Sequence, residues 1–184
     1  MTRDHALELL KKYVKSENMI KHCLASEAVM KAMAFKLGED ADKWSLAGLL
    51  HDIDVELTAN DIEQHGLKAR AILEENNISQ DIIESIKMHN EAASREKRKE
   101  IFHKALAASE TITGLITATA LVYPDKKLQS VKISSILKRM KDKRFAASVD
   151  RNIILECEDI KIPIAEFAQI SLDAMKGISD NLGL

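Results

Sequence analysis

This chain of 184 residues is poor in several residue types, and each scarcity excludes a class of protein. Two cysteines, Cys23 and Cys157, are too few for a disulfide framework or a thiolate metal cluster, so we expect both to be buried core residues. No apolar run approaches the ~20 residues that a membrane-spanning helix needs, and the polar N-terminus shows no signal peptide. We therefore expect a cytoplasmic protein with no membrane partner.

Proline and glycine are also scarce, with two and six residues, and the alternation typical of strands is rare. Most windows instead place apolar residues at the spacing of a helix. We therefore predict an all-α protein, a bundle of eight or nine short helices that forms one domain over residues 1–184. The predicted helices cover residues 4–14, 17–37, 43–52, 66–76, 80–89, 101–122, 131–141, 145–157 and 163–182.

Several helix boundaries follow from residue chemistry. Ser16 and Ser79 precede two of the predicted helices and are suitable N-caps. Gly38 suits the left-handed position that ends a helix, and Pro163 is tolerated in a first helical turn.

The charge balance gives no general attraction to polyanions, because the net charge is −2. Two basic runs, residues 95–99 and 138–144, are both interrupted by acidic residues and resemble solvated helix faces. The second run is the better candidate for contact with a phosphate group. Aromatic residues make up only 4% of the chain, which shows no stacking platform for a base.

The adjacent pair His51-Asp52 is the most informative feature that is present. An imidazole and a carboxylate at neighbouring helical positions can both reach one ion of iron, manganese or zinc. The alternative is a polar helix end, with His51 placed favourably against the helix dipole. His22 lies on a mostly apolar helical stripe, where a hydrogen-bonded core histidine is the alternative to a ligand.

Glu110 is the most telling single carboxylate, because the residues around it are small or apolar. A carboxylate turned toward a core is costly unless it is paired or bound to a metal. Ala107 and Gly114, one turn away on either side, leave room for an ion. The alternative is that Glu110 faces solvent on an amphipathic helix.

Taken in order along the chain, His22, His51-Asp52 and Glu110 resemble the H…HD…D pattern of the HD superfamily of metal-dependent phosphohydrolases. The chain is most similar to small stand-alone bacterial members of the HDIG type. The resemblance implies a metal site formed by these four residues, with Glu110 in place of the usual aspartate. It also implies that His65 and His89 hold a second ion, as matching histidines do in dinuclear relatives.

The sequence departs from those dinuclear relatives at two places. They have two consecutive histidines where this chain has His89-Asn90, and Gly-Lys where this chain has Asp54-Val55. The missing lysine counts against the cyclic-dinucleotide activity of the HD-GYP group.

The function that the resemblance implies is hydrolysis of a small phosphoester, with nucleotides among the candidates, by attack of a metal-activated water. Asp52 is the expected catalytic residue and proton acceptor, and Lys141 and Arg144 are the expected phosphate contacts. The oxygen and nitrogen donors favour iron or manganese as the divalent transition metal, with zinc, nickel or cobalt as alternatives and one ion or two.

Two other functions compete with this interpretation. A signalling or regulatory domain would keep the HD fold, with or without its metal, and would have weak turnover or none. A nucleic-acid-binding helical bundle depends only on the run 138–144, and a nucleic-acid partner is not expected. The expected partner is a small phosphorylated substrate, and the oligomeric state, including a homo-oligomer, is left open.

Overall fold

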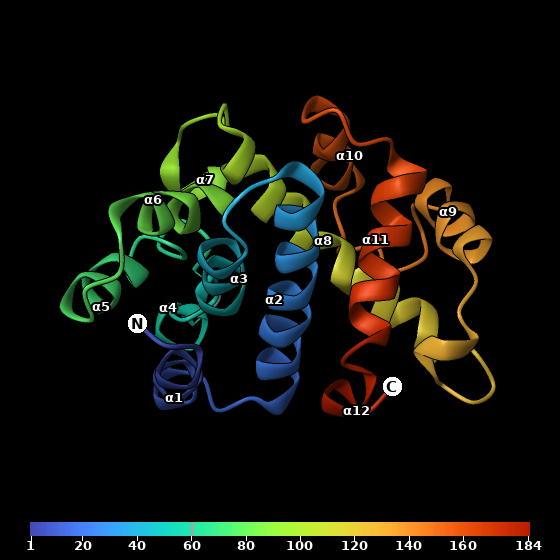
Figure 1. Ribbon diagram of the computed structural model, residues 1–184, viewed down its shortest axis with the longest axis horizontal. Coiled ribbons are helices and arrows are strands. Elements are labelled where there is room, and N and C mark those ends of the chain that lie inside the picture. The colour runs from blue at the N-terminus through green and yellow to red at the C-terminus, as the bar shows by residue number, and fades with distance from the viewer. Residues whose placement is uncertain (60) are drawn as a thin grey trace.

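The computed structural model describes residues 1–59 and 61–184, and in these residues it contains helices and turns but no strands (Figure 1). The α-helices are α1 (Arg3–Tyr13), α2 (Glu17–Leu37), α3 (Ala41–Leu50), α4 (Val55–Thr58), α5 (Ala69–Glu75), α6 (Gln80–His89), α7 (Glu91–Ser94), α8 (Ile101–Leu121), α9 (Ile133–Lys141), α10 (Arg151–Asp159), α11 (Ile164–Lys176) and α12 (Ser179–Leu182). A short 3-10 helix, η1 (Leu128–Ser130), precedes α9.

The predicted all-α class is confirmed. In the described residues, nine helices have seven residues or more, while α4, α7 and α12 are single turns of four residues. Two of the nine are not short, because α2 and α8 each contain 21 residues.

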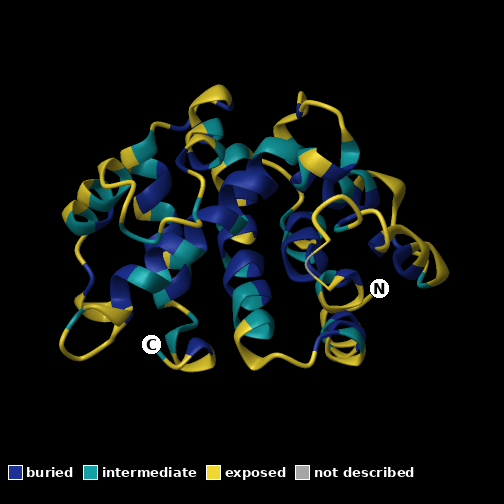
Figure 2. Ribbon diagram, turned by 180° about the vertical axis from the view of Figure 1, so that it is seen from behind, coloured by how far each residue is buried: buried dark blue, intermediate teal, exposed yellow. Residues whose placement is uncertain are grey.

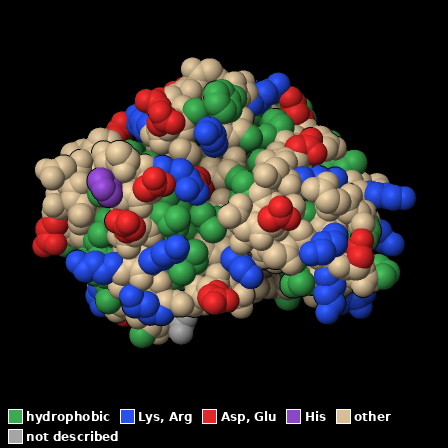
Figure 3. Space-filling model, turned by 60° about the horizontal axis from the view of Figure 1, so that its bottom comes forward, with side chains coloured by type: hydrophobic (Ala, Val, Ile, Leu, Met, Phe, Trp, Pro, Cys, Tyr) green, Lys and Arg blue, Asp and Glu red, His purple; other side chains and the backbone are tan. Residues whose placement is uncertain are grey.

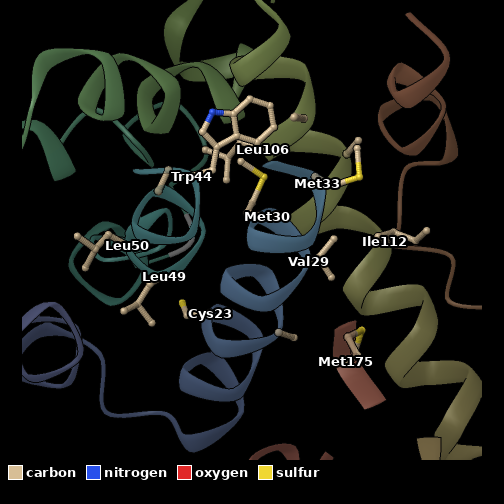
Figure 4. Packing of buried hydrophobic residues seen from close by; sticks show 14 of the residues in the cluster. Cys23, Val29, Met30, Met33, Trp44, Leu49, Leu50, Leu106, Ile112 and Met175 are labelled. Carbon is tan, nitrogen blue, oxygen red and sulfur yellow. The ribbon is translucent and has the colours of Figure 1, made fainter. Parts of the chain in front are cut away.

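Helix α2 stands at the centre of the fold and packs against α3, α8 and α11. In Figure 1, α3 to α7 lie on one side of α2 and α9 to α11 lie on the other. The buried faces of these helices turn toward α2 and α8 (Figure 2). Met30 and Met33 of α2 meet Leu106 and Ile112 of α8 in the core between them (Figure 4).

Helices α2 and α3 approach closely because Gly48 has no side chain. A Cβ atom at this position would lie 2.6 Å from the carbonyl oxygen of Ser26. A contact with backbone at that distance forces the helices apart, so this crossing requires glycine. The close approach matters for the site, because His51 follows one turn after Gly48 and faces His22 of α2.

The predicted ends of α2 are confirmed. Ser16 Oγ accepts a hydrogen bond from the N–H of Met19 at 3.4 Å, and Gly38 ends the helix with φ = 74°. Ser79 occupies the N-cap position of α6 as predicted, but its side chain does not form the capping hydrogen bond. Its hydroxyl donates to Asp81 Oδ1 at 2.5 Å instead of capping α6.

Three other predicted boundaries are wrong. Helix α10 begins at Arg151, not at residue 145, because the preceding residues form turns around the Arg151 guanidinium. Helix α5 begins at Ala69, not at Gly66, whose φ is 88°. The predicted helix over 163–182 is divided into α11 and α12 just after Gly177.

Both cysteines are buried and free, as expected. None of the helices in the described part of the chain is long and apolar enough to cross a membrane.

Candidate metal centre

The structure brings six of the predicted residues together. The six residues come from different elements: His22 from α2, His51 and Asp52 from the turn directly after α3, His65 from the turns before α5, His89 from the last residue of α6, and Glu110 from the middle of α8. Sequence positions nearly 90 residues apart therefore meet at one place, where α2, α3, α6 and α8 converge.

Asp52 joins two groups of histidines. The first triad is His22, His51 and Asp52, and the second triad is Asp52, His65 and His89; in each, the potential ligand atoms lie within 4.8 Å of one another. In the first triad, Asp52 Oδ2 lies 3.5 Å from His22 Nε2 and 3.4 Å from His51 Nε2. In the second, Asp52 Oδ1 lies 3.0 Å from His65 Nε2 and 3.7 Å from His89 Nε2.

The histidines of each triad face one another through their Nε2 atoms. These atoms are 3.1 Å apart between His22 and His51, and 3.0 Å apart between His65 and His89. Each carboxylate oxygen of Asp52 therefore faces a separate pair of imidazole nitrogens, which is the arrangement expected of a carboxylate that bridges two ions.

The Nδ1 atoms of His51 and His89, which face away from Asp52, form hydrogen bonds with the backbone. His51 Nδ1 donates to the carbonyl oxygen of Gly48 at 2.9 Å, and His89 Nδ1 donates to the carbonyl oxygen of Ile86 at 2.5 Å. A carbonyl oxygen only accepts hydrogen bonds, so both Nδ1 atoms carry a hydrogen. Each Nε2 is then the nitrogen left to hold a proton or a metal ion.

The same tautomer follows for the other two histidines from side-chain partners. His65 Nδ1 donates to Asp54 Oδ1 at 2.9 Å. The hydroxyl of Thr113 donates to the carbonyl oxygen of Glu110 at 2.7 Å, so its oxygen accepts from His22 Nδ1 at 3.0 Å. All four Nε2 atoms are thus directed at Asp52 and at one another.

These contacts fit a divalent cation. Four imidazole nitrogens crowd around one carboxylate, and an ion between them would satisfy nitrogen atoms that otherwise face each other. Nitrogen and carboxylate oxygen donors without thiolate suit iron, manganese or zinc. The hydrogen bonds that fix each Nδ1 are the outer contacts through which proteins orient histidine ligands.

The histidine pKa values reflect the balance between burial and neighbouring charge. Burial, together with the nearby His51, lowers the pKa of His22 to about 4, and burial with its histidine neighbours lowers that of His89 to about 3. Burial also opposes the charge of His65, but hydrogen bonds with Asp52 and Asp54 outweigh it and raise its pKa to about 10. In the absence of a cation, a proton on His65 therefore occupies the position facing Asp52.

Glu110 lies at the rim of the first triad. Its Oε2 is 3.8 Å from His22 Nε2, and its Oε1 accepts a hydrogen bond from the hydroxyl of Thr111. Burial raises the pKa of this carboxyl to about 7. Glu110 is therefore turned toward the centre and not toward bulk solvent, and its role as a ligand stays a prediction.

Three side chains of the centre are partly exposed to solvent. The side chains of His22, Glu110 and His65 are 24%, 19% and 18% exposed, whereas that of His51 is only 1% exposed. A ligand from solution would therefore approach past His22, Glu110 and His65.

Asp54 is a residue of the centre that the sequence did not reveal. Its side chain is fully buried, with Oδ1 bonded to His65 Nδ1 and Oδ2 accepting from the N–H groups of Gly66 and Ala69, at 2.8 and 2.9 Å. It therefore orients His65 and fixes the start of α5. An acidic residue between the apolar Ile53 and Val55 was the one signal for it.

Asn90 stands where dinuclear relatives have a second histidine. Its side chain forms hydrogen bonds with the backbone. Its amide donates to the carbonyl oxygens of Ile62 and His65 at 2.7 and 3.0 Å, and its oxygen accepts from the N–H of Ala92 at 3.1 Å. Because both ends of the amide are engaged, Asn90 holds the segment that carries His65.

Arg98 belongs to a basic run that resembled a solvated helix face, yet its side chain is only 3% exposed. It donates to the carbonyl oxygens of Met88 and His89 at 3.1 and 3.0 Å, and pairs with Glu156 at 2.6 Å. This cation therefore anchors the end of α6 that carries His89.

The two predicted phosphate contacts are not among the six clustered side chains. Lys141 is exposed at the end of α9, and the side chain of Arg144 is 96% exposed with Asp142 as its ion-pair partner. The hydrogen bonds and ion pairs of the described residues connect neither cation to the six clustered side chains. His5 and His103 are not part of either triad.

The helical fold and this set of histidines and carboxylates define a helical protein with a candidate two-ion metal centre. The family model for the HD domain matches residues 19–120, which is more than half of the chain and includes all six clustered residues. The chain therefore belongs to the HD domain family, whose members are typically metal-dependent hydrolases. Searches among curated proteins and among solved structures gave no match.

Proposed function

We propose that this protein is a metal-dependent phosphohydrolase that acts on a small phosphoester. The observation that carries the proposal is the inward direction of four Nε2 atoms around the two oxygens of Asp52. Membership of the HD domain family supports the same class of chemistry. The narrower likeness to bacterial HDIG-type members, a nucleotide substrate and a cytoplasmic location stay predictions.

A divalent cation bound here would supply Lewis acidity, which lowers the pKa of a water molecule and polarises a phosphoryl oxygen. The protein's own residues would position the attacking water and the metal-binding histidines. Asp52 stays ionised because the neighbouring histidines hold its pKa well below the usual range, although burial opposes this. Its two carboxylate oxygens can therefore orient the histidines of both triads. They can also accept a hydrogen bond from an attacking water and so orient it.

The substrate would approach through the exposed side of the centre, between His22, Glu110 and His65. Gly114, one turn after Glu110, packs against Val149, because an added Cβ at Gly114 would lie 3.4 Å from Val149 Cγ2. Val149 follows the segment that carries Lys141 and Arg144. We propose that these two cations contact substrate phosphate from that side, where they would balance its negative charge.

A phosphoester panel tests the proposal. Nucleotides, sugar phosphates and simple diesters are assayed with Mn²⁺, Fe²⁺, Co²⁺, Ni²⁺ and Zn²⁺ in turn, using the wild type, Asp52→Asn and the control Asp61→Asn. We expect turnover that Asp52→Asn abolishes and Asp61→Asn preserves, since Asp61 is exposed and outside the centre. No turnover by the wild type under any condition would favour the regulatory domain instead.

A further inference from the structure

One long stretch of the chain carries a strong charge that is opposite in sign to the net charge of the whole chain. Residues 126–144 contain eight basic residues and one acidic residue, in a chain whose net charge is −2. The basic residues are Lys126, Lys127, Lys132, Lys138, Arg139, Lys141, Lys143 and Arg144. All are exposed except Arg139, which is partly buried with its guanidinium 4.7 Å from the ring centre of Phe145.

These charges are hardly neutralised within the protein. Among the described residues, Arg144 alone of the eight has an ion-pair partner, Asp142, at 3.7 Å. The nearby carboxylates instead accept hydrogen bonds from backbone N–H groups and a hydroxyl. Asp125 accepts from the N–H of Lys127 at 3.2 Å and from the hydroxyl of Ser130 at 2.5 Å, and Asp142 accepts from the N–H of Arg144 at 3.1 Å.

The backbone that displays the lysines is held at its first end by Tyr123. The Tyr123 hydroxyl is 2.7 Å from Ser135 Oγ and accepts from the N–H of Lys132 at 3.3 Å, while its carbonyl oxygen accepts from the N–H of Lys126 at 3.1 Å. The turn that carries Lys126 is therefore fixed to the first turn of α9.

At the other end, the buried guanidinium of Arg151 gathers backbone carbonyl groups. It donates to the carbonyl oxygens of Arg139, Asp142, Phe145, Ala146 and Val149. Exposed lysines need no fixed backbone in order to be solvated. Cations displayed on a backbone that is fixed at both ends instead suit a partner whose negative charges repeat along its length.

We propose that residues 126–144 form a docking surface for the phosphate backbone of double-stranded nucleic acid, without base specificity. We call this surface the basic edge. It follows the side of the molecule that carries α9 and the loop before it in Figure 1, and Lys and Arg side chains gather there in Figure 3. Helix α9 alone, with nine residues, is about 13 Å long and would face several phosphates of a duplex.

Two observations favour a duplex over other polyanionic partners. The apolar residues of α9, Ile133, Ile136, Leu137 and Met140, pack against the core, so the helix has no free apolar face to enter a bilayer. The scarcity of aromatic residues leaves no platform for the unstacked bases of a single strand. From the sequence, a nucleic-acid partner depended only on the run 138–144 and was not expected; Lys126, Lys127 and Lys132 extend the basic stretch toward the N-terminus of α9.

The proposal goes beyond hydrolysis and is tested by binding. A fluorescently labelled duplex of about 20 base pairs is titrated with the full-length protein between 50 and 200 mM salt, with anisotropy as the signal. About five neutralised phosphates predict that affinity falls about 500-fold over this range. Asp52→Asn should bind as the wild type does, which separates docking from catalysis.

Charge reversal locates the surface. Lys138→Glu with Lys141→Glu should weaken binding and reduce the dependence of log affinity on log salt by about two. The control, Lys11→Glu with Lys12→Glu, changes the net charge equally in α1, at the opposite end of the molecule (Figure 1). It should leave the affinity within about twofold of the wild type.

Three results would overturn the proposal. One is no binding of the duplex at 50 mM salt. Another is an equal loss of affinity in both double variants, which would indicate only general attraction to charge. The third is binding to vesicles that contain anionic phospholipid, without binding to the duplex. The exposed Leu121 and Val122, next to the basic edge, would then be the membrane contact.

Discussion

Replacement of Asp54 by Asn tests how the second triad is held. Asp54 Oδ1 accepts from His65 Nδ1, and Oδ2 accepts from two backbone N–H groups. Asparagine has one oxygen and one NH₂ group, so it cannot accept all three hydrogen bonds. If its oxygen keeps the two backbone bonds, its NH₂ group faces His65 and donates to Nδ1. The hydrogen of His65 then moves to Nε2, which loses the lone pair that a metal requires.

The expected magnitude follows from the position of Asp54 behind a ligand. Loss of a hydrogen-bond partner to a metal-binding histidine typically lowers metal affinity by about 10- to 100-fold, or ~1.4–2.7 kcal/mol. The first triad shares none of the three hydrogen bonds, so we expect its affinity to change little. Asp54→Asn should therefore weaken one of two metal-binding steps.

Calorimetric titration with Mn²⁺ measures both steps, and ¹⁵N NMR of the imidazoles in protein loaded with diamagnetic Zn²⁺ reports the tautomer of His65. Asp61→Asn is the matched control, because Asp61 lies in the same segment and is exposed. Circular dichroism confirms that the variant is folded. If both binding steps keep their affinity, or His65 keeps its hydrogen on Nδ1, the argument for Asp54 is refuted.

Three further predictions concern the centre and its scaffold. Glu110→Gln should weaken metal binding by about 10- to 100-fold while Glu110→Asp retains it; equal affinity in wild type and Glu110→Gln would exclude this residue as a ligand. Gly48→Ala should lower the free energy of unfolding in urea by about 1–3 kcal/mol, because its methyl group would meet Ser26 backbone, whereas Gly114→Ala should have little effect. Removal of metal with a chelator should lower the melting temperature of the wild type, and an unchanged melting temperature would contradict binding to the folded state.

The sequence predicted most helices because their ends have local chemical signals. The N-cap at Ser16 and the left-handed Gly38 act over a few residues, so both ends of α2 were found. The start of α10 was not, because residues 145–149 are held by the guanidinium of Arg151, and hydrophobic periodicity carries no sign of that contact. The positive φ of Ala146, at 45°, is equally invisible in the sequence.

The centre could be predicted only in part, for a related reason. Candidate ligands form an ordered motif that a resemblance can identify, so His22, His51 and Glu110 could be predicted from the sequence. The residues that orient the ligands follow no such order. Asp54 and Arg98 act through contacts that depend on the folded chain, and Arg98 lies in a run whose composition suggested solvent exposure.

Elemental analysis of the purified protein tests the central claim most directly. Wild type prepared without added metal is compared with His51→Ala and with the control His103→Ala, which changes a histidine outside the cluster. We predict up to two transition-metal ions per chain, iron or manganese foremost, in the wild type and the control, and a sharp loss in His51→Ala. Equal traces of metal in all three proteins would contradict a metal centre at Asp52, and the proposed hydrolase with it.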